Sequence, residues 1–267
     1  MINFPTCKIN LGLQVLKRRF DGYHDIDSAM LEIPLNDVLE VIESTEVSCT
    51  TTGLELPGSG NLILQAKELF EKTFPLPSLA FHLHKNIPMG AGLGGGSSDA
   101  AFALKIFRDV YYPAVSDDEL EKYCAQLGSD CAFFVRGGLQ LASGRGEVLK
   151  PISINFSGYS IYLVNLGIHI STQQAYSLIT PDADRLSVAE ILQKPFSFWK
   201  DELVNDFEVS AFQLYPALKH VKDLFYQHGA FYAAMSGSGS TMFALFEKSP
   251  SAIKWPFKVE FERILTL

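Results

Sequence analysis

The sequence predicts an α+β protein with two lobes, and three observations lead to this fold class. Residues that alternate as in strands and residues that recur at helical spacing are mixed along the chain. A glycine-rich run at 90–96 stands between a strand-like segment and a helix-like one. The pattern changes around Lys150-Pro151, and 267 residues are enough for one large domain or two ordinary ones. We therefore expect one lobe over residues 1–150 and a second over residues 151–267.

Period-two alternation marks the expected strands. In Cys7–Val15 the apolar side chains share one face, which places Lys8 and Asn10 together on the other. A turn at Asp21-Gly22 follows this first strand. Further strand-like segments cover residues 28–47, 79–83, 159–165, 230–235, 241–246 and 257–265.

Helical spacing and cap-type residues mark the expected helices. Ser116 is a suitable N-cap for a helix that ends at Leu127, where Gly128 suits the position just after the last turn. The other helices are expected from Asn61 to about 73, from the glycine-rich run to about 111, and over residues 172–178, 196–207 and 210–228.

Composition excludes several classes of protein. With 47% hydrophobic and 19% charged residues, the chain can form a packed core. The net charge of -8 argues against general binding to nucleic acids or anionic membranes. The four cysteines form no C-x-x-C motif, and no signal peptide or membrane-spanning run is apparent. We therefore expect a cytoplasmic protein with reduced thiols.

The run Pro88–Ser98 predicts a phosphate-binding loop. Glycines allow the backbone to approach a ligand closely, and a helix start offers unpaired N–H groups and a positive dipole end. A flexible linker is the alternative, but a linker is not expected between a strand and a helix. The run satisfies G-x-G-x-x-G, yet no second strand ending in an acidic residue follows, which disfavours a Rossmann site. Walker A and protein-kinase loops are disfavoured because no lysine follows the glycines and the chain has no His-Arg-Asp triplet.

Other candidate residues have both a structural and a functional explanation. Taken alone, Lys8 is better explained as a lysine at a strand edge, and Asp130 as the cap of a following turn or helix. The pair Tyr23-His24 and the glycine loop Ser236–Ser240 fit packing or an ordinary hairpin as well as they fit a binding site. The position of Asp99 near a helix start is explained by the helix dipole.

Taken together, three motifs in order resemble the GHMP kinase superfamily. They are Lys8–Leu13, Pro88–Ser98 and Met235–Ser240. Within the superfamily, Arg19–His24, the triple glycine before Ser97 and Leu127–Asp130 are most similar to kinases that act on cytidine diphosphate-linked substrates. The resemblance covers residues 7–246, roughly, and implies a two-lobed fold. The N-terminal lobe would be of the ribosomal S5 domain 2-like type and the C-terminal lobe ferredoxin-like.

The resemblance also implies an activity. The chain would use ATP and Mg²⁺ to phosphorylate a hydroxyl group of a small molecule, cytidine diphosphate-linked methylerythritol, in non-mevalonate isoprenoid synthesis. The N-terminal lobe would carry the ATP and catalytic residues, and the C-terminal lobe would complete the substrate cleft. No nucleic-acid or membrane partner is expected, and the sequence identifies no metal ligand.

Residue roles follow from the resemblance in the same way. Lys8 and Asp130 would be the catalytic pair, with Lys8 holding Asp130 ionised and Asp130 accepting or orienting the hydroxyl proton. ATP phosphates would lie on Pro88, Met89, Gly90, Ala91, Gly92, Leu93, Gly94, Gly95, Gly96, Ser97 and Ser98. Substrate would be bound by Asn10, Tyr23, His24, Thr172, Tyr176, Gly237, Ser238 and Gly239. The cytosine would stack between Tyr23 and Tyr176, and His24 would read its edge.

Three alternatives remain open. A homoserine or mevalonate kinase would share the three motifs, but the sequence Asp21–His24 argues against it. A non-catalytic nucleotide-binding protein on the same scaffold would need neither Lys8 nor Asp130. A Rossmann dehydrogenase lacks support for the reasons given above.

Overall fold

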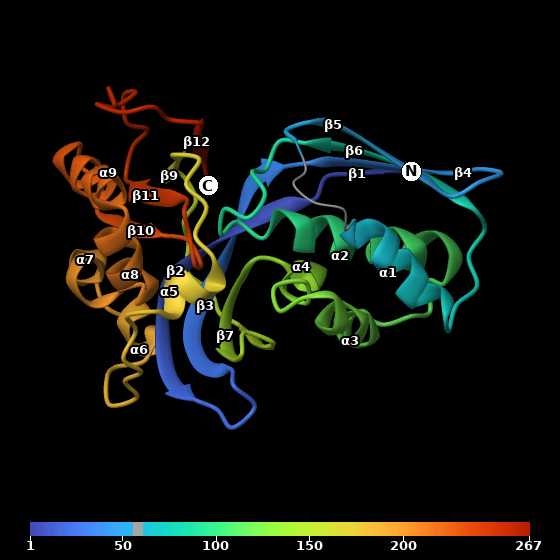
Figure 1. Ribbon diagram of the computed structural model, residues 1–267, viewed down its shortest axis with the longest axis horizontal. Helices are drawn as coiled ribbons and strands as arrows, with labels where there is room; N and C mark the ends of the chain where they lie inside the picture. The colour runs from blue at the N-terminus through green and yellow to red at the C-terminus, as the bar shows by residue number, and fades with distance from the viewer. Residues whose placement is uncertain (56–60) are drawn as a thin grey trace. The chain divides into compact units, whose positions relative to one another are not determined.

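The computed structural model describes residues 1–55 and 61–267, which divide into two compact units (Figure 1). Unit 1 consists of Met1–Lys8, Leu35–Met89 and Gly94–Gly137. Unit 2 consists of Ile9–Pro34, Gly90–Leu93 and Gly138–Leu267. Unit 2 therefore takes in residues from both sides of position 150, and the lobe boundary expected there stays a prediction.

Unit 1 is a sheet with helices on one face (Figure 1). The strand order is β1 (Ile2–Asn3), β4 (Val38–Glu43), β6 (Leu79–Lys85) and β5 (Ser48–Gly53), with β5 parallel to β6 and the other pairs antiparallel. The helices are α1 (Leu62–Glu71), α2 (Gly95–Tyr111), α3 (Asp117–Leu127) and the short α4 (Phe133–Arg136). Alternate residues of β6 are buried, as its sequence predicts.

Side-chain caps begin two of these helices. The side chain of Asn61 accepts from the Ile63 N–H at the start of α1. The side chain of Ser116 accepts from the Glu119 N–H at the start of α3. Each cap satisfies a backbone donor that the helix itself leaves unpaired.

Unit 2 contains two sheets of four strands. The first has the order β2 (Thr6–Arg18), β3 (His24–Asn36), β7 (Leu139–Gly144) and β8 (Val148–Pro151), and the ends of β2 and β3 belong to unit 1. The second is antiparallel, with the order β10 (Tyr232–Met235), β11 (Met242–Phe246), β9 (Ser160–Asn165) and β12 (Phe261–Thr266). The helices are α5 (Thr172–Tyr176), α6 (Val188–Leu192), α7 (Trp199–Glu202), α8 (Phe207–Leu214) and α9 (Pro216–Gln227), with a 3₁₀ turn at Phe196–Phe198.

The two long helices expected near the end of the chain are wrong in their extent. The segment 210–228 is two helices, because Pro216 begins α9 and the residue before a proline is disfavoured in helical conformation. Tyr215 accordingly has φ -135° and ψ 77°. The segment 196–207 leaves helical structure after Glu202, where Leu13 of β2 exchanges backbone hydrogen bonds with Val204 and Asp206.

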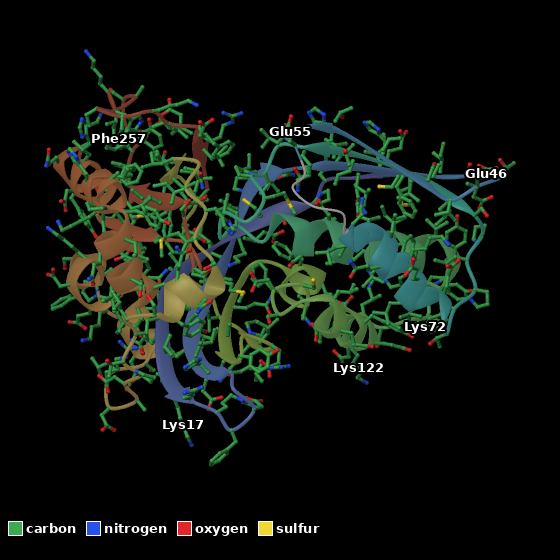
Figure 2. All side chains as sticks on the ribbon, viewed as in Figure 1. Lys17, Glu46, Glu55, Lys72, Lys122 and Phe257 are labelled. Carbon is green, nitrogen blue, oxygen red and sulfur yellow. The ribbon has the colours of Figure 1, made fainter. Side chains whose placement is uncertain are left out.

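The core of unit 2 joins its second sheet to the helices. Buried side chains from β9, β10 and β11 meet Phe207 and Ala211 of α8 and Leu218, Val221 and Phe225 of α9. In Figure 2 charged side chains such as Lys17, Lys72 and Lys122 lie on the outside of their elements, and all three are exposed. None of the helices in the described parts of the chain has the length and apolar character needed to cross a membrane.

Candidate active site

Lys8 and Asp130 form an ion pair in unit 1. The Nζ of Lys8 lies 3.1 Å from Oδ2 of Asp130. The Lys8 side chain is 3% exposed, whereas Asp130 is 31% exposed in the turn between α3 and α4. The burial of Lys8 does not fit a lysine that extends from a strand edge into water. The pair presents a partly exposed carboxylate beside a buried positive charge.

The N-terminus of α2 lies next to this pair. Gly94 precedes the helix with φ +71°, a left-handed conformation that favours glycine, and no side chain caps the helix there. A Cβ at Gly94 would lie 3.0 Å from the Phe134 ring and 3.3 Å from Cγ of Lys8. The chain therefore brings the unpaired N–H groups of a helix start close to Lys8, which suits an anion.

Residues Gly95 and Gly96 are also in close contact with their surroundings. A Cβ at Gly95 would lie 2.9 Å from the Ile87 side chain, and one at Gly96 would lie 3.0 Å from the Met89 side chain. The limb of the loop that contains Pro88 thus packs directly against the first turn of α2. Ser97 and Ser98 complete that turn, and the N–H of Ser98 already donates to the carbonyl of Gly94 at 2.9 Å.

In unit 2 the other part of the glycine run contacts the second glycine loop. Ser236 donates its hydroxyl to the carbonyl of Gly92 at 2.8 Å, and the Thr241 N–H donates to the carbonyl of Ala91 at 3.1 Å. A Cβ at Gly92 would lie 2.0 Å from the Ser236 carbonyl oxygen, so only glycine fits there. The loop from Ser236 to Ser240 connects β10 to β11, as an ordinary hairpin loop would, and it also supports the first glycine run.

The side chain of Asn205 anchors the loop from Ser236 to Ser240. Its side-chain amide donates to the carbonyls of Met235 at 2.7 Å and Gly237 at 2.8 Å. Gly237 and Gly239 both have positive φ. Gly90, at the start of the unit 2 part of the first run, lies near the His169 ring. Backbone groups therefore dominate the contacts of these two glycine segments of unit 2, as is common where phosphates bind.

Asn10 and Tyr23 are placed differently by unit 2. Asn10 is 1% exposed, and its amide donates to the hydroxyl of Ser28 at 2.9 Å. Tyr23 follows the expected Asp-Gly turn and is 56% exposed. The guanidinium of Arg145 lies 4.9 Å from the centre of the Tyr23 ring. The Tyr23 ring is therefore accessible beside this turn, with a positive charge on one of its faces.

His24 and Tyr176 are brought together as a stacked pair. Their ring centres are 4.5 Å apart and their planes differ by 19°. Burial, and secondly the charge of Arg18, lowers the pKa of His24, which favours the neutral form of its ring. The expected cytosine sandwich between Tyr23 and Tyr176 stays a prediction, and His24 already covers one face of Tyr176. Thr172 begins α5, but its side chain lies outside what the structure describes.

Two charged residues near the loop are missing from the sequence-based predictions. Lys85 and Asp37 are 1% and 0% exposed and form an ion pair, and Lys85 also donates to Asp99 at 2.8 Å. Asp99 lies beyond the first turn of α2 and is buried, so the helix dipole alone does not explain it. One signal was available: alternation in β6 places Lys85 on the same buried face as Leu79, Phe81 and Leu83.

The structure offers no protein cluster for a metal ion. Among residues 1–55 and 61–267, no three His, Cys, Asp or Glu side chains gather as a metal site would require. His82 and His84 of β6 hydrogen-bond instead to the hydroxyls of Thr50 and Thr52 on β5.

Two family descriptions match the chain. Residues 61–138 match the family described as GHMP kinases N terminal domain. This range contains α1, the glycine run, α2 and Asp130. Residues 188–254 match the family described as GHMP kinases C terminal. This range contains α6–α9, β10, β11 and the second glycine loop.

Individual proteins agree with these matches. A protein of Cytophaga hutchinsonii named 4-diphosphocytidyl-2-C-methyl-D-erythritol kinase is 49% identical over 253 residues, which are 94% of each chain. A crystal structure of 4-(cytidine 5'-diphospho)-2C-methyl-D-erythritol kinase matches with a TM-score of 0.81 and 32% identity, covering 93% of this chain and 91% of that one. A crystal structure of homoserine kinase from Cytophaga hutchinsonii matches with a TM-score of 0.64 and 17% identity, covering 91% and 86%, and shows the fold alone.

Proposed function

Because the chain belongs to the GHMP kinase family, we propose that it transfers the γ-phosphoryl group of ATP to the 2-hydroxyl of 4-diphosphocytidyl-2-C-methyl-D-erythritol. This reaction is a step of non-mevalonate isoprenoid precursor synthesis. The observation that supports this proposal most directly is the Lys8–Asp130 ion pair. The pair lies beside Gly94, where an added Cβ would lie 3.3 Å from Cγ of Lys8. A pair of this kind beside an uncapped helix N-terminus is suited to phosphoryl transfer.

The residues of unit 1 fit an ATP triphosphate. The start of α2, where no side chain forms a cap in the described residues, offers backbone donors, and its glycines allow close packing of the loop around them. Pro88–Ser98 would hold the phosphates. We include Mg²⁺ as a companion of ATP, because phosphoryl transfer depends on neutralising the charge of the phosphates.

The catalytic pair has a division of roles. Asp130 has a partly exposed carboxylate that can accept or orient the proton of the attacking hydroxyl. Lys8 holds that carboxylate in place, and its buried positive charge also favours the negative charge that develops on the transferring group. Asn10, two residues further along β2, would contact the substrate near the reacting hydroxyl.

The substrate's cytidine would be recognised by residues of unit 2. Tyr23 offers an accessible ring for stacking, and the neutral form of the His24 ring next to Tyr176 can hydrogen-bond to a base edge. Thr172, Gly237, Ser238 and Gly239 would complete the substrate contacts. In this proposal residues 1–150 supply ATP binding and catalysis, and residues 151–267 supply the remaining substrate contacts. None of the four cysteines forms a disulfide in the described residues, which fits the reducing cytoplasm in which we place the enzyme.

A coupled assay of ADP release tests the proposal. The purified protein would be offered ATP with 4-diphosphocytidyl-2-C-methyl-D-erythritol, homoserine or mevalonate, and Asp130→Asn would serve as the background control. We expect turnover with the cytidyl substrate only. A higher kcat/KM for homoserine or mevalonate would assign a different kinase activity, and ADP release with none of the three would favour a non-catalytic nucleotide-binding protein.

A further inference from the structure

Three ionisable side chains are buried together beneath the start of α2, and we call them the buried triad. Lys85 ends β6, Asp37 directly precedes β4, and Asp99 is the fifth residue of α2. They are 1%, 0% and 3% exposed. The Lys85 ammonium donates to Asp37 and, at 2.8 Å, to Oδ2 of Asp99. The triad therefore contains one positive charge for two carboxyl groups.

Asp37 and Lys85 fix the two limbs of the glycine run. Oδ1 of Asp37 accepts from the backbone N–H groups of Asn86 at 2.6 Å and Ile87 at 2.9 Å. These residues lead directly into Pro88. On the other limb, a Cβ at Gly95 would lie 3.3 Å from the Lys85 ammonium. With three donors around it, Asp37 is well satisfied as an anion.

Asp99 lacks this support. Its Oδ2 accepts from Lys85, but its Oδ1 is buried and has no hydrogen-bond partner in the described residues. Because Lys85 also neutralises Asp37, an ionised Asp99 leaves a surplus negative charge in the interior. Burial raises the pKa of Asp99 to about 7; the charge of Lys85 opposes this shift and that of Asp37 adds to it.

Among the described residues, the groups that shift the pKa of Asp99 are Lys85 and Asp37, and two further groups near α2 add no positive charge at Asp99. On β5, the thiol of Cys49 has its own pKa raised, chiefly by burial and to a smaller degree by the charge of Asp99. On α1, which packs against α2, the buried Lys67 is already paired with Glu71. The ionisation of Asp99 is therefore decided within the triad.

We propose that an ATP phosphate group bound at the N-terminus of α2 is accompanied by a proton taken up on Asp99. The inference rests on the proposed function, because it requires the phosphates to lie on Pro88–Ser98. A bound phosphate brings negative charge to a helix terminus that has the ionised Asp99 in its next turn, and like charges in a poorly solvated site repel. Protonation of Asp99 removes the repulsion, so by linkage the proton and the nucleotide favour each other.

Asp99 does not touch the phosphate in this scheme. It is a positioning residue that sets the charge beneath the loop, while Lys85 and Asp37 hold the loop itself. Nucleotide affinity should therefore fall as pH rises through the range in which free Asp99 ionises. The loss is limited to about tenfold per pH unit for a single linked proton.

Calorimetry can count the proton. ADP would be titrated into the protein at pH 7.5 in buffers that differ in ionisation enthalpy, since the terminal phosphate is then already ionised. If free Asp99 has a pKa of about 7 and is fully protonated in the complex, about three-quarters of a proton is taken up. Asp99→Asn should take up close to none. It should also bind ADP equally well at pH 7 and pH 8.5, whereas the wild type, on the same two premises, weakens about 16-fold.

Asp109→Asn is the matched control. Asp109 lies near the other end of the same helix, is about half exposed and pairs with Arg108. This variant should keep the proton uptake and pH dependence of the wild type. Proton uptake that persists in Asp99→Asn, or that is absent from the wild type, would overturn the coupling.

Two further measurements keep the outcomes separate. If Asp99→Asn does not fold, carbon NMR of wild-type protein labelled at the aspartate carboxyls should show one resonance that titrates near neutral pH and moves toward the protonated position when ADP is added. No such resonance would overturn the inference. ADP binding that Gly94→Ala leaves unchanged would instead overturn the phosphate site itself, and with it the proposed function of this loop.

Discussion

Replacing Gly94 by alanine tests the contact between the glycine run and Lys8. The substitution has two costs that the structure separates. At φ +71° an L-residue loses about 1–2 kcal/mol relative to glycine. The added Cβ would also lie 3.0 Å from the Phe134 ring and 3.3 Å from Cγ of Lys8. To reach the ordinary contact distance of 3.4 Å, the contact with Phe134 must open by about 0.4 Å and the contact with Lys8 by about 0.1 Å.

The consequence for catalysis follows from the position of Lys8. A misplacement of 1 Å in an active site can cost about a hundredfold in rate, so displacements of about 0.1 Å at Lys8 and up to about 0.4 Å at Gly94 should lower kcat about two- to sixfold. We expect a loss of nucleotide affinity of similar size, because the backbone donors at the start of α2 shift with Gly94. Steady-state kinetics and calorimetry with ADP measure the two effects.

Gly138→Ala is the control for the backbone cost. Gly138 has φ +73° and nothing within 4 Å of its missing Cβ, so it carries the strain without the contact. Both variants should lose a few degrees in Tm, at about 2–4 °C per kcal/mol for a chain of this size. Only Gly94→Ala should lose activity and nucleotide affinity. Wild-type kcat and affinity in Gly94→Ala would refute the placement of the phosphates beside Lys8.

Three further predictions concern other parts of the protein. Lys8→Met and Asp130→Asn should each reduce kcat at least about a hundredfold with ADP affinity nearly intact. The double variant should be little worse than either single variant, because the pair acts as a unit. Additive losses of kcat would show that the two residues have independent roles. Tyr23→Ala should raise KM for the cytidyl substrate about ten- to a hundredfold and leave KM for ATP unchanged. The wild-type protein should strongly reject the uridine analogue of this substrate. Equal kcat/KM for the cytidine and uridine substrates would argue against recognition of the base. Burial raises the pKa of the Cys124 thiol and raises that of the Cys131 thiol to about 11. Neither thiol should therefore react with iodoacetamide at pH 7.5 until the protein unfolds. Mass spectrometry that finds either cysteine labelled in the native protein would contradict this prediction.

Local signals in the sequence predicted the elements on which the site is built. Asn61 and Ser116 begin helices where their cap-type side chains predict it, and the glycine run ends at the start of α2. The Asp21-Gly22 turn also forms where it is expected. These features depend on residues that are near one another in the chain, so the sequence alone was sufficient to determine them.

Some local expectations failed where another local signal or a distant contact prevailed. Pro216 divides the helix expected over 210–228 into two, because the residue before a proline is disfavoured in helical conformation. After Glu202 the chain leaves helical structure to hydrogen-bond with Leu13, which is far away in sequence. The first could be anticipated from the sequence, and the second could not.

The charges of the site were decided by the tertiary structure. From the sequence alone, Lys8 is better explained as a strand-edge lysine and Asp130 as a cap, yet folding buries Lys8 against the Asp130 carboxylate. Asp99 appeared to serve only the helix dipole, and folding places it with Lys85 and Asp37 in the interior. Ionisation and pairing depend on burial and on neighbours contributed by distant segments, which no local pattern specifies. The sequence by itself therefore determined most of the elements and the position of the glycine run before α2, while only the tertiary structure decided which of the charged side chains meet.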